Sequence, residues 1–503
     1  MVLAFIIIWF LREAKVILFW LFLWQLKEYR FERFVDHFRT AKGRRLLFNP
    51  LLGVKLVLLG AALFVPNAVF FALLLYAVEL LRKSPRPVFT KKIQVLAILL
   101  IVFAFAFGFS QTLVFLLLFD ITTPLVVSGL VLGLQPFTVL VRNRRLAQAK
   151  AKRAMFPNVK VVGITGSYGK TSTKEFLAHI LSAKFRVLKT PEHQNSEFGV
   201  ANTILQKLTA EHQVFVCEMG AYKKGEIKAL AQAAQPHIGI VTGVNEQHLA
   251  TFGSMENLLS AEGGEELIGS LPKGGAAILN GASQKLKAQI SKLKTAARNV
   301  KFIVAGEDVR AEDVRVEKEH ISFTVYGVKF RVPAYGGHNA QNLLGAIGAA
   351  RELGMDLQEI AKAAASMPLE LSPLKVKKAA SGITVIDSTY SANPDGVIAD
   401  LDYLGLYEGK KALVMPSLIE LGPAAKEAHK KIGRKIAQVC DVAIITTREH
   451  FADIKEGAGG SEKVVYMENA QEILEKVKGA DAILLESRLP ETLIKKLQGE
   501  TMV

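Results

Sequence analysis

The sequence of 503 residues has little cysteine and no surplus of acidic residues, with 46 Asp or Glu against 63 Lys or Arg. Its two cysteines, Cys217 and Cys440, are too few for a disulfide framework or a cysteine-based metal site. This usage is typical of a reducing compartment. Internal repeats and low-complexity tracts are also missing, so we expect roughly two to four ordinary domains.

Acidic residues are scarcest in the first 153 positions, which hold 6 of them against 21 Lys or Arg. The other 350 positions carry 40 acidic and 42 basic residues and are almost neutral. The positive charge therefore belongs to one end of the chain and not to a nucleic-acid groove. We expect no nucleic-acid partner.

Long apolar runs fill the same end of the chain, at residues 1–26, 51–81 and 93–140. A membrane helix needs about 20 apolar residues, and a cleaved signal peptide would explain one such run but not three. The segments between the runs are rich in Lys and Arg, which keeps short loops in the cytoplasm. We expect residues 1–153 to be a multi-pass region of the cytoplasmic membrane with four or five helices, and the rest of the chain to lie in the cytoplasm.

Breaks in these runs predict where the membrane helices end. Pro66 and Asn67 predict a turn, and further breaks are expected at residues 108–111 and 120–124. Asp120 is an intramembrane acid away from a segment end, which makes it a candidate for function. Because it adjoins an expected break, we place it at the membrane interface.

From residue 159 onward, short apolar runs alternate with helical stretches. This alternation predicts parallel sheets with helices on both faces. A linker is expected at residues 366–373, between two series of strands. The expected strands are 159–165, 214–218, 238–242, 276–279, 383–387, 411–415, 441–446, 464–466 and 482–485.

The strongest motif is Gly-Ile-Thr-Gly-Ser-Tyr-Gly-Lys-Thr at residues 163–171, between a predicted strand and a predicted helix. A glycine-rich loop at this place wraps phosphates with backbone N–H groups, and the helix N-terminus adds positive potential. Lys170 would reach the phosphates of ATP, and Thr171 would hold Mg²⁺. The expected phosphate-binding residues are Gly166, Ser167, Tyr168, Gly169, Lys170, Thr171 and Ser172.

Two polar residues follow the next predicted strands. Glu218 ends the strand at 214–218, and His248 follows the strand at 238–242. Ligands of α/β sheets bind at this edge, and Mg²⁺ prefers carboxylate oxygens. Both residues are therefore candidate metal ligands, although an ordinary strand-end acid and a structural histidine would look the same.

These motifs, in this order, resemble the Mur ligase family. Its phosphate-binding loop is written Gly-x-Thr-Gly-[Ser/Thr]-x-Gly-Lys-[Ser/Thr]. Its substrate loop, its Glu-Met-Gly-Ala run, its histidine segment, its Gly-His-Asn-x-x-Asn motif and two C-terminal motifs also have counterparts. These counterparts lie at residues 189–199, 218–227, 242–253, 337–342, 387–394 and 420–429.

The resemblance implies an ATP- and Mg²⁺-dependent amide ligase of peptidoglycan precursor synthesis. The most similar branch adds D-alanyl-D-alanine to a UDP-linked muramoyl tripeptide through an acyl phosphate. The implied fold is α/β, with a P-loop ATPase domain over residues 154–368 and a Rossmann-like domain over residues 369–503. The implied site residues are Lys170, His248 and Asp387 for catalysis, Thr171, Glu218 and His248 for metal, Asn339 and Asn342 for ATP, and Asn195, Tyr390 and Asn393 for substrate.

Three residues depart from the family's pattern. Gly264 stands where the family carries a lysine that becomes a metal-bridging carbamate, Pro373 where it carries an arginine, and Ser388 where it carries a second aspartate. A nearby carboxylate can replace the carbamate. The candidates are Glu262, Glu265 and Glu266.

The usual N-terminal UDP-binding domain is also missing, and the apolar region occupies its place. A lipid-linked muramoyl peptide is therefore an alternative acceptor. Two further alternatives remain, which are a Mur-type ligase for another amine and an ATP-binding membrane scaffold that has lost turnover. A membrane transport ATPase is the weakest alternative, because the P-loop is its single signature.

Overall fold

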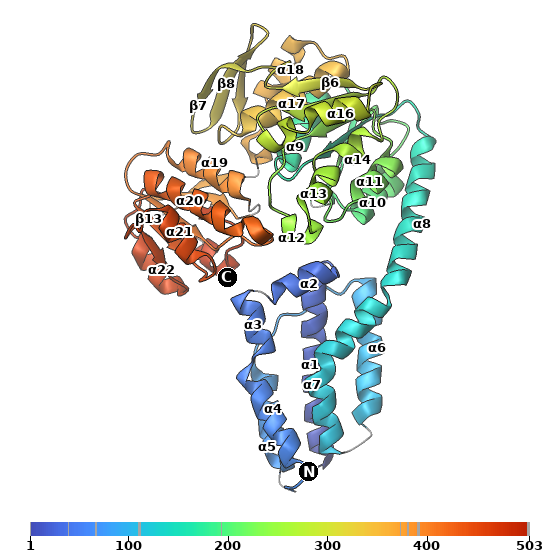
Figure 1. Ribbon diagram of the computed structural model, residues 1–503, viewed down its shortest axis with the longest axis vertical. Coiled ribbons are helices and arrows are strands. Elements are labelled where there is room, and N and C mark those ends of the chain that lie inside the picture. The colour runs from blue at the N-terminus through green and yellow to red at the C-terminus, as the bar shows by residue number, and fades with distance from the viewer. Residues whose placement is uncertain are drawn as a thin grey trace. The chain divides into compact units, whose positions relative to one another are not determined.

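The computed structural model describes residues 2–38, 40–65, 68–108, 112–192, 194–372, 374–379, 382–389 and 393–499. The chain forms two compact units, Met1–Val141 and Arg142–Val503. The first unit is helical and the second is α/β (Figure 1).

The helical unit has five helices of 12 residues or more among its described residues, with two short helices after the first. The turn predicted at residues 66–67 and residues 109–111 of a predicted break lie outside the described residues. The helices are α1 (Val2–Leu26), α2 (Phe31–His37), α3 (Ala41–Leu47), α4 (Pro50–Ala61), α5 (Ala68–Leu81), α6 (Lys91–Gly108) and α7 (Leu113–Gly133).

Two helices of the described chain are long and apolar enough to cross a membrane, at Lys91–Gly108 and Leu113–Ala154. The second comprises α7 and α8 (Gln135–Ala154). Helix α1 has 25 residues but carries three charged side chains. Helices α4 and α5, with 12 and 14 residues, fall short of the roughly 20 that a crossing needs.

Charged side chains lie inside the helical unit. Arg12 contacts Asp120 and lies 2.6 Å from Glu79, while Lys55 lies 3.1 Å from both acids. Glu13 is fully buried and lies 2.9 Å from Arg12. We name these five residues the inner charge cluster. They come from four helices, so the cluster joins α1, α4, α5 and α7.

One expectation for α7 is wrong, and with it the reason for placing Asp120 at an interface is lost. Asp120 is buried in the inner charge cluster. The helix also continues through Pro124, where a break was expected. Near the proline, the hydroxyls of Thr122 and Thr123 donate to carbonyls one turn earlier at 2.7 and 2.9 Å, and such bonds help a membrane helix accommodate proline.

A six-stranded parallel sheet, in the order β2-β3-β1-β4-β5-β6, forms the first half of the α/β unit. Apolar side chains of alternate strand positions face two different helical layers. The strands are β1 (Lys160–Thr165), β2 (Val187–Lys189), β3 (Val214–Glu218), β4 (Ile238–Val241), β5 (Ala276–Asn280) and β6 (Lys301–Ala305).

Helices α9, α17 and α18 cover one face of this sheet, and α10, α11 and shorter helices cover the other. The helices on the first face are α9 (Lys170–Ser182), α17 (Asn339–Glu352) and α18 (Leu357–Ala365). The others are α10 (Glu197–Lys207), α11 (Glu226–Ala234), α12 (Leu249–Phe252), α13 (Met255–Ala261), α14 (Glu265–Ile268), α15 (Gln284–Lys287) and α16 (Ile290–Ala296). An antiparallel sheet that was not predicted follows, with β7 (Glu312–Val316), β8 (His320–Val325) and β9 (Val328–Pro333).

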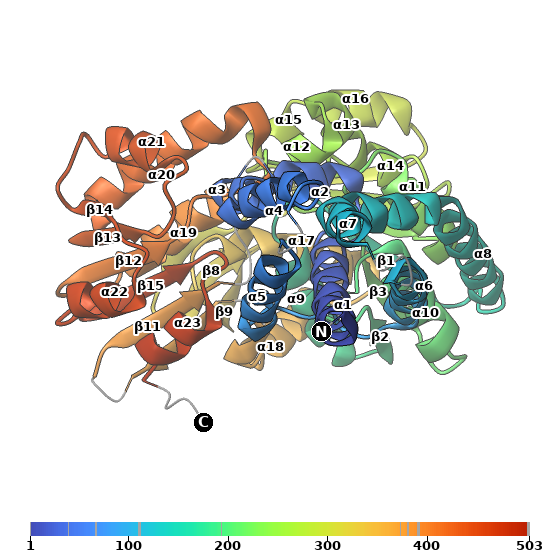
Figure 2. The ribbon, with the colours of Figure 1, turned by 90° about the horizontal axis from the view of Figure 1, so that it is seen from below.

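A second six-stranded sheet forms the last part, in the order β10-β11-β15-β12-β13-β14, of which β10 alone is antiparallel. Figure 2 shows the run from β14 to β11 at the left. The strands are β10 (Lys375–Lys378), β11 (Thr384–Ser388), β12 (Lys411–Met415), β13 (Val442–Ile445), β14 (Val464–Tyr466) and β15 (Ala482–Glu486). The helices are α19 (Pro394–Leu404), α20 (Ala425–Val439), α21 (Phe451–Gly457), α22 (Ala470–Val477) and α23 (Glu491–Leu497).

The second half of α8 is fixed to the first sheet's domain. Arg153 is fully buried and donates to three backbone carbonyls at 2.6 to 3.1 Å. Arg145 donates to Asn202 at 2.7 Å, and Lys152 donates to the carbonyl of Leu205 at 2.8 Å. Both acceptors belong to α10, so α8 lies along that helix.

Candidate active site

The glycine-rich loop joins β1 to α9 in a conformation that glycine adopts most easily. Gly166 and Gly169 have φ of +138° and +78°, which residues with a side chain rarely adopt. A Cβ atom on Gly166 would overlap Thr242, and one on Gly169 would overlap the Asn342 amide. The loop therefore lies tightly against the end of β4 and against α17, with a helix N-terminus directly after it. This arrangement binds phosphate.

Lys170, the first residue of α9, turns back over the loop. Its ammonium donates to the carbonyl of Gly166 and, at 3.2 Å, to that of Ser167. The positive charge thus lies where the phosphates of a nucleotide enter such a loop. Tyr168 is half-buried, and burial raises the pKa of its hydroxyl. Ser172 is buried in the first turn of α9.

Glu218, at the end of β3, faces the first turns of α9. Its Oε1 accepts from Thr171 Oγ1 at 3.1 Å and from Asn195 Nδ2 at 2.9 Å. Its Oε2 lies 3.2 Å from Lys174 Nζ. Two neighbouring oxygen ligands of an octahedral Mg²⁺ lie about 3 Å apart, because each bond is about 2.1 Å. The separation of the Thr171 and Glu218 oxygens therefore fits a shared Mg²⁺.

A second acid, Glu262, contacts the loop itself. Ser167 Oγ donates to its Oε2 at 2.7 Å, and His248 Nδ1 lies 2.9 Å from its Oε1. Burial alone would raise the pKa of Glu262, but His248, Lys170 and Ser167 outweigh burial and hold the pKa below its usual value. The carboxylate is therefore charged at neutral pH. Its oxygens are of the kind that Mg²⁺ prefers, and His248 contacts one of them.

The structure distinguishes among the three glutamates that the sequence left open. Glu265 pairs with Lys292 at 2.6 Å, and Glu266 accepts from two backbone N–H groups at the start of α11. Gly264, which was aligned with the family's lysine, has φ of +91° and begins α14. The side chain that reaches the loop thus belongs to Glu262 and not to position 264, because α13 ends just before it.

Asn339 and Asn342 lie in the first turn of α17, beside the loop. Asn342 Nδ2 donates to Asn339 Oδ1 at 2.9 Å, and Asn339 Nδ2 donates to the carbonyl of Tyr335 at 2.7 Å. The oxygen of Asn342 lies against Gly169. The sequence-predicted nucleotide residues are therefore brought together, although Asn339 uses its amide to hold the start of the helix.

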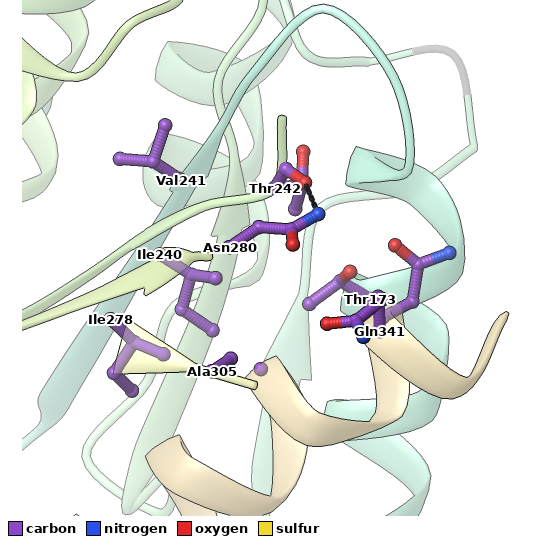
Figure 3. A pocket seen from close by; sticks show the side chains of 10 residues that line it. Thr173, Ile240, Val241, Thr242, Ile278, Asn280, Ala305 and Gln341 are labelled. Carbon is purple, nitrogen blue, oxygen red and sulfur yellow. Dashed lines mark hydrogen bonds between the residues drawn. The ribbon is translucent and has the colours of Figure 1, made fainter. Parts of the chain in front are cut away.

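A small cavity lies behind the loop, between α9, α17 and the ends of β4 and β5 (Figure 3). The Asn280 amide donates to the Thr242 carbonyl at 2.5 Å within it. None of its described lining residues is titratable, so we assign no chemistry to it. The lining residues are Thr173, Ile240, Val241, Thr242, Ile278, Asn280, Ala305, Gln341, Asn342 and Gly345.

The last domain reaches this region through Asn393, the N-cap of α19. Asn245 Nδ2 donates to Asn393 Oδ1 at 2.8 Å and to Asp395 Oδ2 at 3.2 Å. The N–H of Asn245 in turn donates to Ser167 Oγ of the loop at 3.1 Å. Asn393 is thus linked to the phosphate loop through one residue.

Asp387 is engaged elsewhere. Its Oδ1 accepts from Thr389 Oγ1 at 2.7 Å, and its Oδ2 accepts from Gln498 Nε2 at 2.8 Å. Among the described residues, no hydrogen bond brings it to the loop. Ser388 donates to Asp400 at 2.6 Å. The predicted substrate residue Tyr390, and Pro373, lie outside the described residues.

Two site residues were missed from the sequence, Lys174 and Asn245. Lys174 is fully buried beside Glu218, four residues after Lys170 on the same helix. A lysine at that spacing turns to the same face as Lys170, and this was the available signal. Asn245 carried no comparable signal, because its partner Asn393 is 148 residues away.

Comparison with known proteins agrees with this geometry. Residues 164–350 match the Mur ligase middle domain, and residues 374–488 match the glutamate ligase domain of Mur ligases. The UDP-N-acetylmuramoyl-tripeptide–D-alanyl-D-alanine ligase of Bacillus subtilis is 30% identical over 330 residues, covering 63% of this chain and 70% of the relative. The enzyme of the same name from Mycobacterium bovis is 32% identical over 366 residues, covering 69% and 71%.

A solved structure shows the same similarity. The crystal structure of MurF from Acinetobacter baumannii superimposes with a TM-score of 0.65 at 26% identity, covering 71% of this chain and 81% of that one. With the loop, its two acids and both domain matches in place, the chain belongs to the Mur ligase family.

Proposed function

We propose that this protein is an ATP-dependent ligase that joins a carboxylate of a muramoyl peptide to the amine of D-alanyl-D-alanine. One observation carries this proposal. Lys170 lies over the glycine-rich loop. Glu262 accepts a hydrogen bond from a hydroxyl of the loop, and Glu218 accepts one from a hydroxyl of α9. The two relatives described above are named as ligases for this reaction.

In the first step, a carboxylate oxygen of the acceptor attacks the γ-phosphorus of ATP, which gives an acyl phosphate and ADP. Lys170 and the loop N–H groups neutralise the charge that develops on the phosphoryl oxygens. Thr171 and Glu218, with Glu262 and His248, would hold Mg²⁺, which screens the phosphates when it is bound.

In the second step, the amine nitrogen attacks the acyl carbon, phosphate leaves and the amine gives up a proton. Asn195 lies beside Glu218 and is positioned to orient the acceptor, while Asn393 connects the last domain to the loop. Closure of that domain excludes water, which protects the acyl phosphate from hydrolysis.

We further propose that the helical unit is embedded in the cytoplasmic membrane. It places the inner charge cluster inside and large apolar side chains outside, the reverse of a soluble helical bundle. Phe64 and Leu81 are 84% and 86% exposed, whereas Glu13 is 0% exposed. Of the four or five membrane helices expected, we retain three candidate crossings: α6 and α7, which are long and apolar enough, and α1, which carries three charged residues. Basic flanking segments support a cytoplasmic location for the catalytic domains.

This organisation has three parts, which we place at residues 1–153, 154–368 and 369–503, although the compact helical unit itself ends at Val141. The two family matches lie within the second and third parts. Helix α8 ends the first part and packs along α10, the helix that begins after Asn195. A membrane-bound first part favours an acceptor that is itself in the membrane, so a lipid-linked muramoyl peptide is the acceptor we favour over a UDP-linked one.

The test is ADP release by the full-length protein in detergent, with Mg²⁺, ATP and D-alanyl-D-alanine. UDP-linked and lipid-linked muramoyl tripeptides are compared as acceptors, and Lys170→Ala is the control. We expect acceptor-dependent release that the control lacks, with faster turnover on the lipid-linked acceptor. ATP binding without acceptor-dependent release would support the inactive scaffold instead.

A further inference from the structure

A line of alternating charges runs from the candidate metal ligand to the outer edge of the first sheet. Lys174 Nζ lies 3.2 Å from Glu218 Oε2 and 3.2 Å from Glu175 Oε1. Glu175 in turn pairs with Lys189. We name Glu218, Lys174, Glu175 and Lys189 the ion-pair chain. From Lys174 outward the exposure increases, since the Lys174 side chain is fully buried, Glu175 is 13% exposed and Lys189 is 43% exposed.

The ion-pair chain ends where the segment of the candidate substrate residue begins. Lys189 is the last residue of β2, and Thr190 follows it. Thr190 is fully buried, and its Oγ1 accepts from the N–H of Glu218 at 3.0 Å. At the other end of the segment, Asn195 donates to Glu218 Oε1, and its carbonyl accepts from Gly220 at 2.9 Å. Both ends of the segment are therefore tied to the end of β3.

Charge balance explains why the chain needs four members. A buried Lys174 without an acid, or a buried Glu218 without a base, would be strongly unfavourable. The Lys174 ammonium lies between the carboxylates of Glu218 and Glu175, so neither Lys174 nor Glu218 is left without a partner of opposite charge. The Glu175 carboxylate pairs with both Lys174 and Lys189, and its position therefore fixes that of Lys189. A well-packed apolar pair could supply equal stability, so the ion-pair chain is better explained by the position that it imposes.

We propose that Glu175 and Lys189 are positioning residues that hold Thr190 and Asn195 in register with Glu218, and so determine how tightly the acceptor binds. This inference rests on the proposed function, because it assigns the segment to the acceptor. Neither residue contacts the phosphate loop in the described structure, so both act on acceptor binding and leave the chemical step and the nucleotide unchanged.

The experiment compares Glu175→Gln, Lys189→Met and the double variant with the full-length protein. Each single change is expected to raise the acceptor KM by about fivefold or more. The kcat and the affinity for Mg²⁺ and ATP should stay within about twofold of the unmodified protein. The double variant should bind the acceptor no more weakly than Glu175→Gln alone, because that change already breaks the pair that Lys189→Met removes. Lys189→Arg should restore the KM.

The matched control is Lys184→Met, which removes an exposed lysine just after α9 whose partner is Glu359 at 2.9 Å. It should change none of these constants. An unchanged acceptor KM in Glu175→Gln, additive effects in the double variant, or an equal fall in kcat would overturn the proposal.

A second readout keeps this inference separate from the proposed function. Amide hydrogen exchange of the segment that starts at Thr190 should be about fivefold faster or more in Glu175→Gln than in the unmodified protein, with no change in Lys184→Met. If the unmodified protein shows no acceptor-dependent turnover, the proposed function fails while this exchange result still decides the role of the ion-pair chain. Equal exchange in the three proteins would overturn it.

Discussion

We expect Glu262 to be, after Lys170, the residue on which turnover most depends. Its carboxylate accepts from Ser167 and contacts His248, and the combined effect of His248, Lys170 and Ser167 holds its pKa below the usual value despite burial. We expect a permanent carboxylate in this place to replace the lysine carbamate, which depends on dissolved carbon dioxide. The departure at Gly264 is therefore compatible with an active ligase.

We predict that Glu262→Gln lowers kcat by about a hundredfold, because an oriented negative charge beside the cation site is lost. Glu265→Gln is the matched control, since that glutamate pairs with Lys292 at the surface, and it should have little effect. Steady-state kinetics measure both. Turnover of the unmodified protein should also be the same with and without added bicarbonate, and a requirement for bicarbonate would contradict the role of Glu262.

Glu486, at the end of β15, gives a prediction for pH. It is fully buried, and burial, with the neighbouring Asp400 carboxylate, raises its pKa well above the usual 4.5. Between those two pKa values the folded protein holds a proton that the unfolded chain releases. The free energy of unfolding should therefore fall as pH rises above 4.5.

Glu486→Gln should remove this pH dependence. The last domain of the variant should therefore gain more stability over the unmodified protein at about pH 8 than at about pH 5. The measurement is hydrogen exchange of β15, corrected for the intrinsic rate at each pH. Glu491→Gln, on the exposed first turn of α23, is the control. Equal pH dependence in Glu486→Gln and the unmodified protein would show that Glu486 is not the responsible group.

Much of the site could be predicted from local sequence, but its long-range pairs could not. The loop at residues 163–171 and Glu218 are recognisable because glycine spacing and a strand-end acid carry the chemistry locally. Asn245 and Asn393 pair across 148 positions, and nothing in either neighbourhood specifies the other. The choice of Glu262 over Glu265 and Glu266 depends on where α13 ends, and the local sequence does not show this.

At the scale of elements, the inner charge cluster holds the helical unit together. Asp120 on α7 accepts from Arg12 on α1 and from Lys55 on α4, and Lys15 donates to backbone carbonyls at the end of α5. Helices α4 and α5 are too short to cross a membrane, so their polar groups need partners inside the bundle. The inner charge cluster and Lys15 supply these partners.

We predict that Asp120→Asn destabilises the helical unit by about 3–5 kcal/mol, because two buried cations lose a charged partner. Phe115→Leu, at an exposed position of α7, is the control. Tryptophan fluorescence during thermal unfolding in detergent reports this unit alone, because all three tryptophans lie in α1. An unchanged unfolding midpoint in Asp120→Asn would contradict the role of the cluster.

Well-separated apolar runs mark the buried strands of a parallel sheet, so the nine predicted strands all appear. The hairpin of β8 and β9 was missed, although Tyr326 and Gly327 adopt φ of 46° and 79° in a two-residue turn. A tyrosine does not predict a turn with positive φ, because such turns favour Asn, Asp or Gly. The helix break expected near Pro124 does not occur, because α7 accommodates the proline inside a packed bundle.

At the scale of the whole molecule, a ligase of two α/β domains is joined to a helical unit that exposes apolar side chains. We predict that the full-length protein stays with the membrane fraction after an alkaline carbonate wash, because insertion into the bilayer covers the exposed apolar residues of α4, α5 and α6. Release into the wash would show that the helical unit is peripheral.

The central claim is that the protein activates a carboxylate as an acyl phosphate. The most direct measurement uses a muramoyl tripeptide whose reacting carboxylate carries ¹⁸O, with ATP, Mg²⁺ and D-alanyl-D-alanine. The mechanism predicts that each amide formed releases one phosphate carrying one ¹⁸O from that carboxylate, and that Lys170→Ala releases none. Phosphate released without ¹⁸O, or at a rate independent of the acceptor, would contradict the claim.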